Sequence, residues 1–242
     1  MTTHHLHNAD CFEVLPTIPD HSIHLVATDL PFCCTSLAWD TPIDLPALWS
    51  HYQRVLNPKG AVVLNADIRL AAKLLETAPK SWFRYDLVWD KTATTGYLDS
   101  NRRPLRKHEL ILVFSPVGYP TYNPIMGVGQ PYQTRRVKNA EVYGAHEGVT
   151  TVNHGSRYPT SIIQVSNANA FGKLHPTQKP IKLLENLIST YSNPGDTVLD
   201  SCMGSGTAGV AALGIGRSFV GIEKDLEIFN TAKQRIEGIS TQ

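Results

Sequence analysis

The feature that most constrains the fold is a strand, a glycine-rich loop and a helix in direct succession near the end of the sequence. Residues 197–200 form a short apolar run that ends in an acid, 201–207 hold two glycines, and 208–213 are small or apolar throughout. Glycines let the backbone approach a ligand closely, and the helix that follows presents unpaired N–H groups. A second strand-like run at 218–222, followed by Glu223, predicts a β-α-β unit with parallel strands.

Strand-like and helix-like stretches also alternate through the first 115 residues. Apolar residues recur at helical spacing in two segments, 45–56 and 68–77, which predicts a helix in each. Short apolar runs predict three buried strands, at 61–64, 83–89 and 109–114. The residues Asn-Pro-Lys-Gly at 57–60 predict a turn before the strand at 61–64. This alternation predicts an α/β fold with a single, mostly parallel, doubly wound sheet.

The pattern is interrupted between residue 116 and about residue 165. This segment is rich in Pro, Gly and Asn, holds five of the nine tyrosines, and includes the basic cluster Arg135-Arg136-Val137-Lys138. A long stretch without secondary structure inside a compact domain is uncommon and usually functional. Regular structure then resumes, with helices expected from about 180 and 226. We therefore expect one domain over 1–242, in which an irregular insertion divides a single sheet into parts at about 6–115 and 166–237.

Composition excludes several classes of protein. Apolar residues make up 42% and charged residues 18%, which is typical of a chain that folds. No apolar run reaches the length of a membrane span, and the start lacks the features of a signal peptide, so a cytoplasmic protein is expected. The four cysteines show no C-x-x-C spacing, so we expect neither a disulfide framework nor a metal site. A net charge of +1 argues against wholesale wrapping of nucleic acid but not against a local basic face.

Two cofactors compete for the glycine-rich loop. Gly204, Gly206 and Gly209 satisfy G-x-G-x-x-G, and Glu223 ends the next strand, where it could hold a ribose. A nicotinamide dinucleotide would require a second mononucleotide-binding half, but only 19 residues follow Glu223. S-adenosylmethionine lacks phosphates and prefers hydrogen bonds to acids such as Asp200 and Glu223. A tight turn without a ligand is the third interpretation, and a nicotinamide-dependent oxidoreductase remains an alternative function.

A second motif lies near the start, where Thr28-Asp29-Leu30-Pro31-Phe32 follows the apolar run at 23–27. Together with the loop at 200–207, this motif resembles those of the amino-group DNA methyltransferases, which act on adenine N6 or cytosine N4. Residues 29–32 look like the catalytic D-P-P-Y tetrapeptide, and 200–207 look like D-P-F-x-G-S-G-T. Because the catalytic motif precedes the cofactor motif, the order is similar to that of the family's β class, which has a circularly permuted arrangement.

Further segments extend this resemblance over roughly residues 6–115 and 165–237. Residues 8–12, Asn-Ala-Asp-Cys-Phe, look like the segment whose Asp meets the adenine of S-adenosylmethionine. Residues 175–180, His-Pro-Thr-Gln-Lys-Pro, are similar to the H-P-x-x-K-P signature near the methionine moiety. Trp89-Asp90-Lys91 and His108-Glu109 resemble a W-x-K and H-E pattern on two later strands. The resemblance weakens in the insertion, which in this family is the target-recognition region.

The resemblance implies S-adenosyl-L-methionine as the cofactor and assigns roles to individual residues. The catalytic group would be Asp29, Leu30, Pro31 and Phe32. The cofactor-binding group would be Asp10, Cys11, Asp29, His175, Thr177, Lys179, Asp200, Ser201, Gly204, Ser205, Gly206, Thr207, Glu223 and Lys224.

This sequence departs from the family pattern at a few positions. Leu30 replaces the first proline of the tetrapeptide, Phe32 replaces its tyrosine, and Ser201-Cys202 replaces Pro-Phe. Leu30 keeps the backbone carbonyl, which with the Asp29 carboxylate would accept the two hydrogens of the target amine. Phe32 keeps the face on which a flipped-out base would stack. We therefore expect the activity to be retained.

The resemblance implies a site-specific DNA methyltransferase of the restriction-modification kind that acts on double-stranded DNA. Adenine N6 is favoured as the target because the family usually carries Asp at position 29 for adenine and Ser for cytosine. An N4-cytosine methyltransferase and an inactive DNA-binding relative are the alternatives, and a homodimer is common in this class. Phosphates would be contacted by basic residues in two clusters, which are Arg102, Arg103, Arg106 and Lys107, and Arg135, Arg136 and Lys138.

Overall fold

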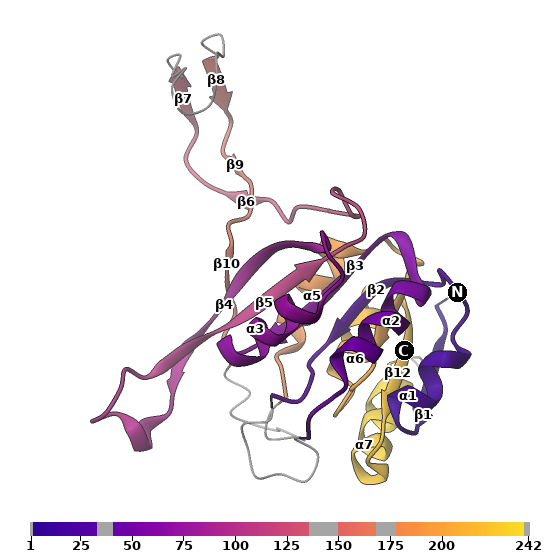
Figure 1. Cartoon of the computed structure of the whole chain (residues 1–242). Helices are drawn as coiled ribbons and strands as arrows, with labels where there is room; N and C mark the ends of the chain where they lie inside the picture. Colours follow the sequence, from indigo (N-terminus) through magenta and orange to yellow (C-terminus); the bar gives the residue numbers. More distant parts are fainter. Residues whose placement is uncertain (1, 33–40, 136–149, 168–177, 240–242) are drawn as a thin grey trace. The chain divides into compact units, whose positions relative to one another are not determined.

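The computed structural model describes residues 2–32, 41–135, 150–167 and 178–239 of the chain (Figure 1). These residues form two compact units, one made of 1–123 and 161–242 and the other of 124–160. No helix in the described ranges is long and apolar enough to cross a membrane.

The larger unit is built on an eight-stranded sheet in the order β1-β12-β11-β2-β3-β5-β4-β10. All neighbouring strands are parallel except at β5, which runs antiparallel to both β3 and β4. The mostly parallel α/β sheet predicted from the sequence is therefore confirmed. The strands, in sheet order, are β1 (His4–Asn8), β12 (Ser218–Glu223), β11 (Thr197–Asp200), β2 (Ile23–Thr28), β3 (Leu56–Ala66), β5 (Arg106–Phe114), β4 (Phe83–Thr95) and β10 (Ile162–Gln164).

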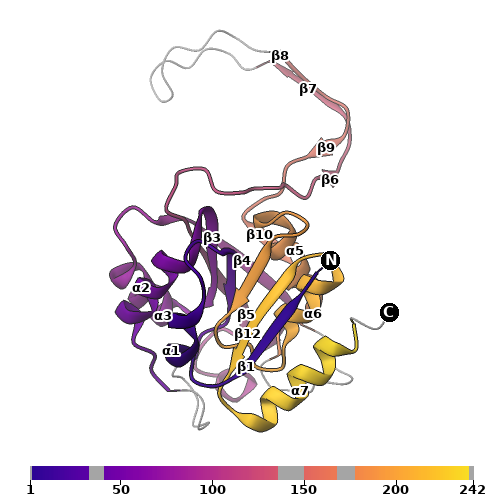
Figure 2. The ribbon, with the colours of Figure 1, turned by 90° about the vertical axis from the view of Figure 1, so that its right-hand side faces the viewer.

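Helices cover both faces of this sheet, as Figure 2 shows. One face carries α1 (Cys11–Val14), η1 (Leu15–Thr17), α2 (Leu45–Val55) and α3 (Ile68–Thr77), and the other carries α5 (Ile181–Tyr191), α6 (Thr207–Gly214) and α7 (Leu226–Glu237). Alternate residues of each strand enter the two apolar cores. In β3, Val62 and Leu64 pack on the α2 side, whereas Ala61 and Val63 pack on the α5 side. A sheet buried on both faces explains why its strands read as continuous apolar runs.

The sequence predicted the start of β3 wrongly. The strand begins at Leu56, and residues 57–60 leave the ladder as a bulge, because Ile23 pairs with Leu56 while Leu25 pairs with Ala61. A Cβ at Gly60 would lie 2.8 Å from the carbonyl oxygen of His24 in β2, so only glycine fits this crossing. The turn residues therefore form an interruption within the strand rather than a boundary before it.

The strands β4 and β5 were also longer than expected, and they form an antiparallel hairpin. The ladder continues past a register shift to the pair Thr95–Arg106, with the short helix η2 (Tyr97–Asp99) at the tip. Beyond the core the strands of the hairpin are mostly polar, so apolar runs alone could not reveal its full length. Strand β1 was missed for a similar reason, because His4–Asn8 contains a single apolar residue.

The smaller unit, within the expected insertion, contains regular structure where none was predicted. Strand β6 (Gly127–Val128) pairs with β9 (Ser156–Arg157), and β7 (Tyr132–Arg135) pairs with β8 (Thr150–Asn153), both antiparallel. The Arg157 guanidinium lies 4.6 Å from the centre of the Tyr132 ring, a cation–π contact within the unit. Side chains of β7 are exposed throughout, so no buried apolar pattern marks this strand in the sequence.

Candidate active site

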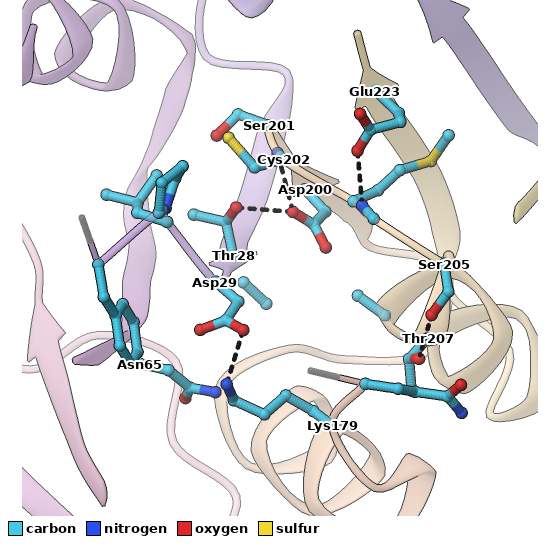
Figure 3. Close-up of a pocket in the computed structure, with 18 of the residues that line it drawn as sticks. Thr28, Asp29, Asn65, Lys179, Asp200, Ser201, Cys202, Ser205, Thr207 and Glu223 are labelled. Carbon is cyan, nitrogen blue, oxygen red and sulfur yellow. Dashed lines mark hydrogen bonds and ion pairs between the residues drawn. The ribbon is translucent and has the colours of Figure 1, made fainter. Parts of the chain in front are cut away.

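A cavity of about 1220 Å³ opens at the edge of the sheet where the parallel strands end. Ligand sites of open α/β sheets lie at this edge, because loops leaving neighbouring strands diverge there. The lining comes from the carboxyl ends of β2, β3, β11 and β12, from the hairpin β4–β5 and from the segment before α5. Among the acids that line it, Asp29, Asp200 and Glu223 are far apart in sequence and lie around the cavity (Figure 3). Asp10 lines it as well.

Asp29 directly follows β2 and faces this cavity. Its Oδ2 atom lies 2.6 Å from the Lys179 ammonium, whereas its Oδ1 atom is inaccessible to solvent and has no hydrogen-bond partner among the described residues. Burial raises the pKa of Asp29, and the positive charge of Lys179 opposes that shift. One oxygen is thus paired and the other is left as an acceptor.

The next three residues combine a core anchor with a half-buried aromatic ring. Leu30 is only 2% exposed and its side chain belongs to the apolar core on the α2 side. Phe32 packs against the same core, and the Lys179 ammonium lies 5.4 Å from its ring centre. At position 30 the chain therefore has a buried leucine in place of the family's rigid proline, and packing of that side chain fixes the segment instead.

Asp200, at the end of β11, is the acid of the neighbouring strand. Its Oδ1 accepts hydrogen bonds from the Thr28 hydroxyl at 2.6 Å and from the Cys202 backbone N–H at 3.1 Å. No cation pairs with it among the described residues. Burial, the largest cause, raises the pKa of Asp200 to about 7, and the nearby carboxylates of Asp29 and Glu223 add to the rise.

Glu223, at the end of β12, ties the glycine-rich loop to the sheet. Its two carboxylate oxygens accept hydrogen bonds from the backbone N–H groups of Gly204 at 3.0 Å and Asp225 at 2.9 Å. Burial raises its pKa. Gly206 has φ 75° at the position before α6, a left-handed conformation that favours glycine. The Glu223 hydrogen bonds and the left-handed Gly206 thus fix the path of the loop between β11 and α6.

Asp10 lies beyond the end of β1 on the same edge. Its carboxylate accepts from the Phe12 backbone N–H at 3.0 Å, which caps α1, and pairs with the Lys224 ammonium at 3.1 Å. The Phe12 N–H, followed by Lys224, lowers the pKa of Asp10. Nearby, the hydroxyls of Tyr52 and Ser201 lie 2.6 Å apart, which connects α2 to the loop after β11.

Most of the site residues expected from the sequence come together in this cavity. Those that line it are Asp10, Cys11, Asp29, Leu30, Pro31, Phe32, Lys179, Asp200, Ser201, Gly204, Ser205, Thr207, Glu223 and Lys224, with Arg106 at the hairpin. Gly206 does not line the cavity but precedes Thr207 in the loop. His175, Thr177, Arg136 and Lys138 lie outside the described residues.

The expected DNA-contacting residues are divided between the two units. Arg102, Arg103, Arg106 and Lys107 are exposed on the β4–β5 hairpin, and Arg135 is exposed in β7 of the smaller unit. Arg103 pairs with Asp99 at 2.7 Å and Lys107 with Asp90 at 3.4 Å. At the hairpin tip Tyr97 and Leu98 are 67% and 102% exposed, although both are apolar.

Sequence reasoning gave no role to several residues of the cavity wall, and three of them bear on the chemistry of the site. Asn65, near the end of β3, is buried beside Asp29 and Lys179, as Figure 3 shows. Lys91 and Glu109 also line the cavity, although the sequence had suggested no role for their motif. The signal for Asn65 was a polar residue following the apolar run at 61–64, the same pattern that identified Asp29 after β2. Within the described ranges, no group of three or more acids, histidines or cysteines is arranged to hold a metal ion.

Two curated relatives that match nearly the whole chain are type II methyltransferases. The chain is 28% identical to the type II methyltransferase M1.MboII of Moraxella bovis over 247 residues, which cover 94% of each protein. It is 26% identical to the type II methyltransferase M.HpaI of Haemophilus parainfluenzae, covering 95% of this chain and 73% of that protein.

Solved structures of similar proteins share the fold over nearly the whole chain. M1.HpyAVI, solved as a complex with SAM, is 24% identical, with a TM-score of 0.65 and coverage of 96% of this chain and 100% of that one. The cytosine-N4-specific PvuII DNA methyltransferase is 19% identical, with a TM-score of 0.70 and coverage of 99% and 92%. At these identities the likeness establishes the methyltransferase fold.

The sequence profile of the DNA methylase family, whose members modify N6 or N4 amines, matches residues 44–234. That match spans most of the larger unit and the whole of the smaller one. The methyl donor of this family is S-adenosyl-L-methionine, the cofactor predicted from the sequence. The chain therefore belongs to the N6/N4 amino-methyltransferase family of DNA methylases.

Proposed function

We propose that this protein transfers a methyl group from S-adenosyl-L-methionine to the exocyclic N6 amine of an adenine flipped out of double-stranded DNA. The observation that carries the proposal is the Oδ1 atom of Asp29, a buried carboxylate oxygen without a hydrogen-bond partner in the described structure. Asp29 lines a cavity large enough for a nucleoside cofactor and a base together. A buried, unpaired acceptor is costly, so such an oxygen suggests a binding partner.

The cavity wall suits S-adenosylmethionine, which carries positively charged groups and no phosphate. Asp200, Glu223 and Asp10 surround the glycine-rich loop, and their carboxylates favour cationic and hydroxyl groups over phosphates. When bound, the cofactor supplies an electrophilic methyl group on a sulfonium sulfur.

Asp29 and Leu30 would prepare the amine for attack. The Asp29 carboxylate and the Leu30 backbone carbonyl accept one N–H each, which localises the nitrogen lone pair and directs it toward the methyl carbon. The nitrogen forms the new N–C bond as the C–S bond breaks, with that electron pair going to sulfur. The nitrogen then loses one proton, which the Asp29 carboxylate accepts.

Phe32 would stabilise the base outside the duplex. Flipping a nucleotide costs a few kcal/mol of pairing and stacking, and stacking on an aromatic ring is worth about 1 to 3 kcal/mol. The ring is only half-buried and lines the cavity near Asp29. Pro31, with its fixed φ, holds the ring close to the acceptor.

The hairpin and the smaller unit would contact the duplex. Arg102 and Arg106 are exposed on the hairpin whose base lines the cavity, so a base bound there leaves its strand close to these cations. The smaller unit, with exposed Tyr132, Arg135 and Val152, offers polar and apolar groups for target recognition.

One experiment separates adenine from cytosine as the target. The protein is incubated with methyl-labelled S-adenosylmethionine and unmethylated DNA, and the DNA is digested to nucleosides. The presence of Asp rather than Ser at position 29 favours N6-methyldeoxyadenosine as the labelled product. Label in N4-methyldeoxycytidine would instead support the cytosine alternative, and no label would support an inactive DNA-binding relative.

A further inference from the structure

Four charged side chains of alternating sign lead from the hairpin to Asp29, and we call them the charge chain. Lys91 in β4 lies 2.6 Å from Glu109 in β5, Glu109 lies 3.3 Å from Lys179, and Lys179 lies 2.6 Å from Asp29. The side chains of Lys91, Glu109 and Lys179 are 9%, 16% and 12% exposed, and that of Asp29 is 31% exposed. Three of the four charges are thus nearly removed from solvent, where each depends on its neighbours.

The arrangement is unlike a simple ion pair that holds two elements together. A buried ion pair contributes little net stability compared with apolar residues of similar volume, so burial alone does not explain four such charges. All four residues line the cavity. Of the four carboxylate oxygens in the chain, only Asp29 Oδ1 lacks both a hydrogen bond and an ion pair among the described residues. The chain ends at the acceptor assigned to the amine.

The contacts also fix the orientation of the Asp29 carboxylate. The Lys179 ammonium occupies Oδ2, whereas Oδ1 is buried and has no hydrogen-bond partner among the described residues. Lys179 itself is held from the other side by Glu109 and lies 5.4 Å from the Phe32 ring. Glu109 and Lys91 are fixed in turn by the paired strands β4 and β5, where Glu109 is opposite Trp89. One ammonium thus locates both the acceptor and the stacking ring.

We propose that Lys179 is a positioning residue for methyl transfer, keeping Asp29 ionised and rotated so that Oδ1 accepts the amine hydrogen, with Glu109 and Lys91 holding Lys179 in place. This inference rests on the proposed function. It adds a role for Lys91 and Glu109, the residues of the W-x-K and H-E pattern to which the proposed mechanism assigns none.

The charges around Asp29 determine in which direction each substitution should shift its pKa. Burial raises the pKa of Asp29. The positive charges of Lys179 and Lys91 lower this pKa, and the negative charge of Glu109 raises it. Asp200, on the adjacent strand, is the other acid that interacts with Asp29. Loss of Lys179 would therefore leave a buried carboxyl that stays protonated to higher pH, whereas loss of the Glu109 charge would act in the opposite direction.

The test is the pH dependence of the single-turnover methylation rate in Lys179→Met, Lys179→Arg and Glu109→Gln. We expect Lys179→Met to slow the reaction about 100-fold near neutral pH and to move the acid limb of the profile up by about one pH unit or more. Lys179→Arg should restore most of the rate, because it restores the charge. Glu109→Gln should move the acid limb down, a change of opposite sign that general structural damage cannot produce.

Lys182→Met is the matched control, since Lys182 is two residues beyond Pro180, is 70% exposed and pairs only with Glu185 in the described structure. Binding of S-adenosylhomocysteine by calorimetry and thermal unfolding are measured on every variant. An acid limb that does not move in either variant, or a loss confined to cofactor affinity, would overturn the positioning role. A wild-type protein that methylates no adenine would instead overturn the proposed function, so the two failures are distinguishable.

Discussion

Asp29 directly follows β2, and Asp200 is the last residue of the adjacent parallel strand β11. The two acids differ in whether a cation pairs with them. Asp29 is paired with a cation at 2.6 Å, whereas Asp200 accepts hydrogen bonds only from a hydroxyl and a backbone N–H in the described structure. Both carboxyls are desolvated, which raises the pKa of each. The comparison shows that one cavity keeps two acids in different electrostatic environments.

This difference matches the two tasks that we propose. An acceptor for an amine hydrogen must be ionised before the base arrives, and Lys179 provides the charge that favours ionisation. An acid beside a cationic cofactor needs no resident cation, because the ligand itself brings positive charge. We call the part of the cavity around Asp200 and Glu223 the cofactor end and the part around Asp29 the catalytic end. Among the described residues only neutral donors contact Asp200 and Glu223, so the cofactor end stays negative, whereas the charge chain neutralises the catalytic end.

The largest effect on the cofactor end is expected for Glu223→Gln. The amide would place an N–H group against the Gly204 or Asp225 N–H that now donates to this side chain. Losing a charged acceptor costs about 2 to 3 kcal/mol, so S-adenosylhomocysteine affinity should fall roughly 100-fold by calorimetry. An unchanged affinity in a folded variant would remove Glu223 from the cofactor site. Glu237→Gln, exposed at the end of α7, is the control.

Asp200→Asn should change how stability depends on pH. The pKa of Asp200 is raised by burial to about 7 in the folded state, so its favourable contribution is complete below the unfolded value near 4 and is lost as pH rises through 7. Without a titrating group at this position, the variant should gain about 2 kcal/mol relative to the wild type between about pH 5 and pH 7.5. Urea unfolding at both pH values measures this gain.

A constant difference between the two proteins at both pH values would contradict the raised pKa of Asp200. Asp86→Asn, on an exposed residue of β4, controls for loss of an acid outside the cavity.

Gly209→Ala should destabilise the protein by about 1 to 3 kcal/mol through overpacking beneath the cofactor loop. An added Cβ would lie 2.6 Å from the Ile236 side chain and 2.7 Å from the Phe219 ring, both in the core. Gly214→Ala in the same helix meets nothing within 4 Å and serves as the matched control. Equal free energies of unfolding for the two variants would contradict the prediction, because they would show that the close packing of α6 at Gly209 leaves room for a methyl group.

The smallest effect is expected at the hairpin, outside both ends of the cavity. Arg102→Gln should weaken DNA binding and reduce the slope of log affinity against log salt by about 0.9, the value for one phosphate contact. Arg103→Gln should do less, because Arg103 already pairs with Asp99. Arg69→Gln, exposed on α3, should leave the salt slope unchanged. Identical slopes for Arg102→Gln and the wild type would move the DNA surface away from the hairpin.

The cofactor end could be predicted from local sequence because its constraints are local. A strand, a loop with Gly204 and Gly206, and a helix of small residues lie consecutively, and each has a recognisable residue pattern. Asp29 was recognisable for the same reason, as an acid that directly follows an apolar strand. The order of the motifs then predicted the sheet and its permuted connections, because parallel strands bring their carboxyl ends to one edge.

The remaining features depend on contacts between distant segments. Lys179 meets Asp29 across 150 residues, and neither residue carries a local signal for the other. Leu30 is a departure from the family tetrapeptide in the sequence, but its packing in the core is evident only in three dimensions. At the bulge of residues 57–60, turn-forming residues lie inside a strand whose pairing with β2 continues on both sides. The Pro and Gly at these positions predict a turn, so the sequence alone does not reveal the continued pairing.

The central claim is that Asp29 is the acceptor that activates the target amine. Its most direct test is the single-turnover methyl-transfer rate of Asp29→Asn at saturating S-adenosylmethionine, with cofactor affinity measured on the same preparation. The account predicts a rate about 1000-fold below that of the wild type at saturating cofactor, because a preorganised charged acceptor is lost. A rate within a few fold of the wild type would contradict it.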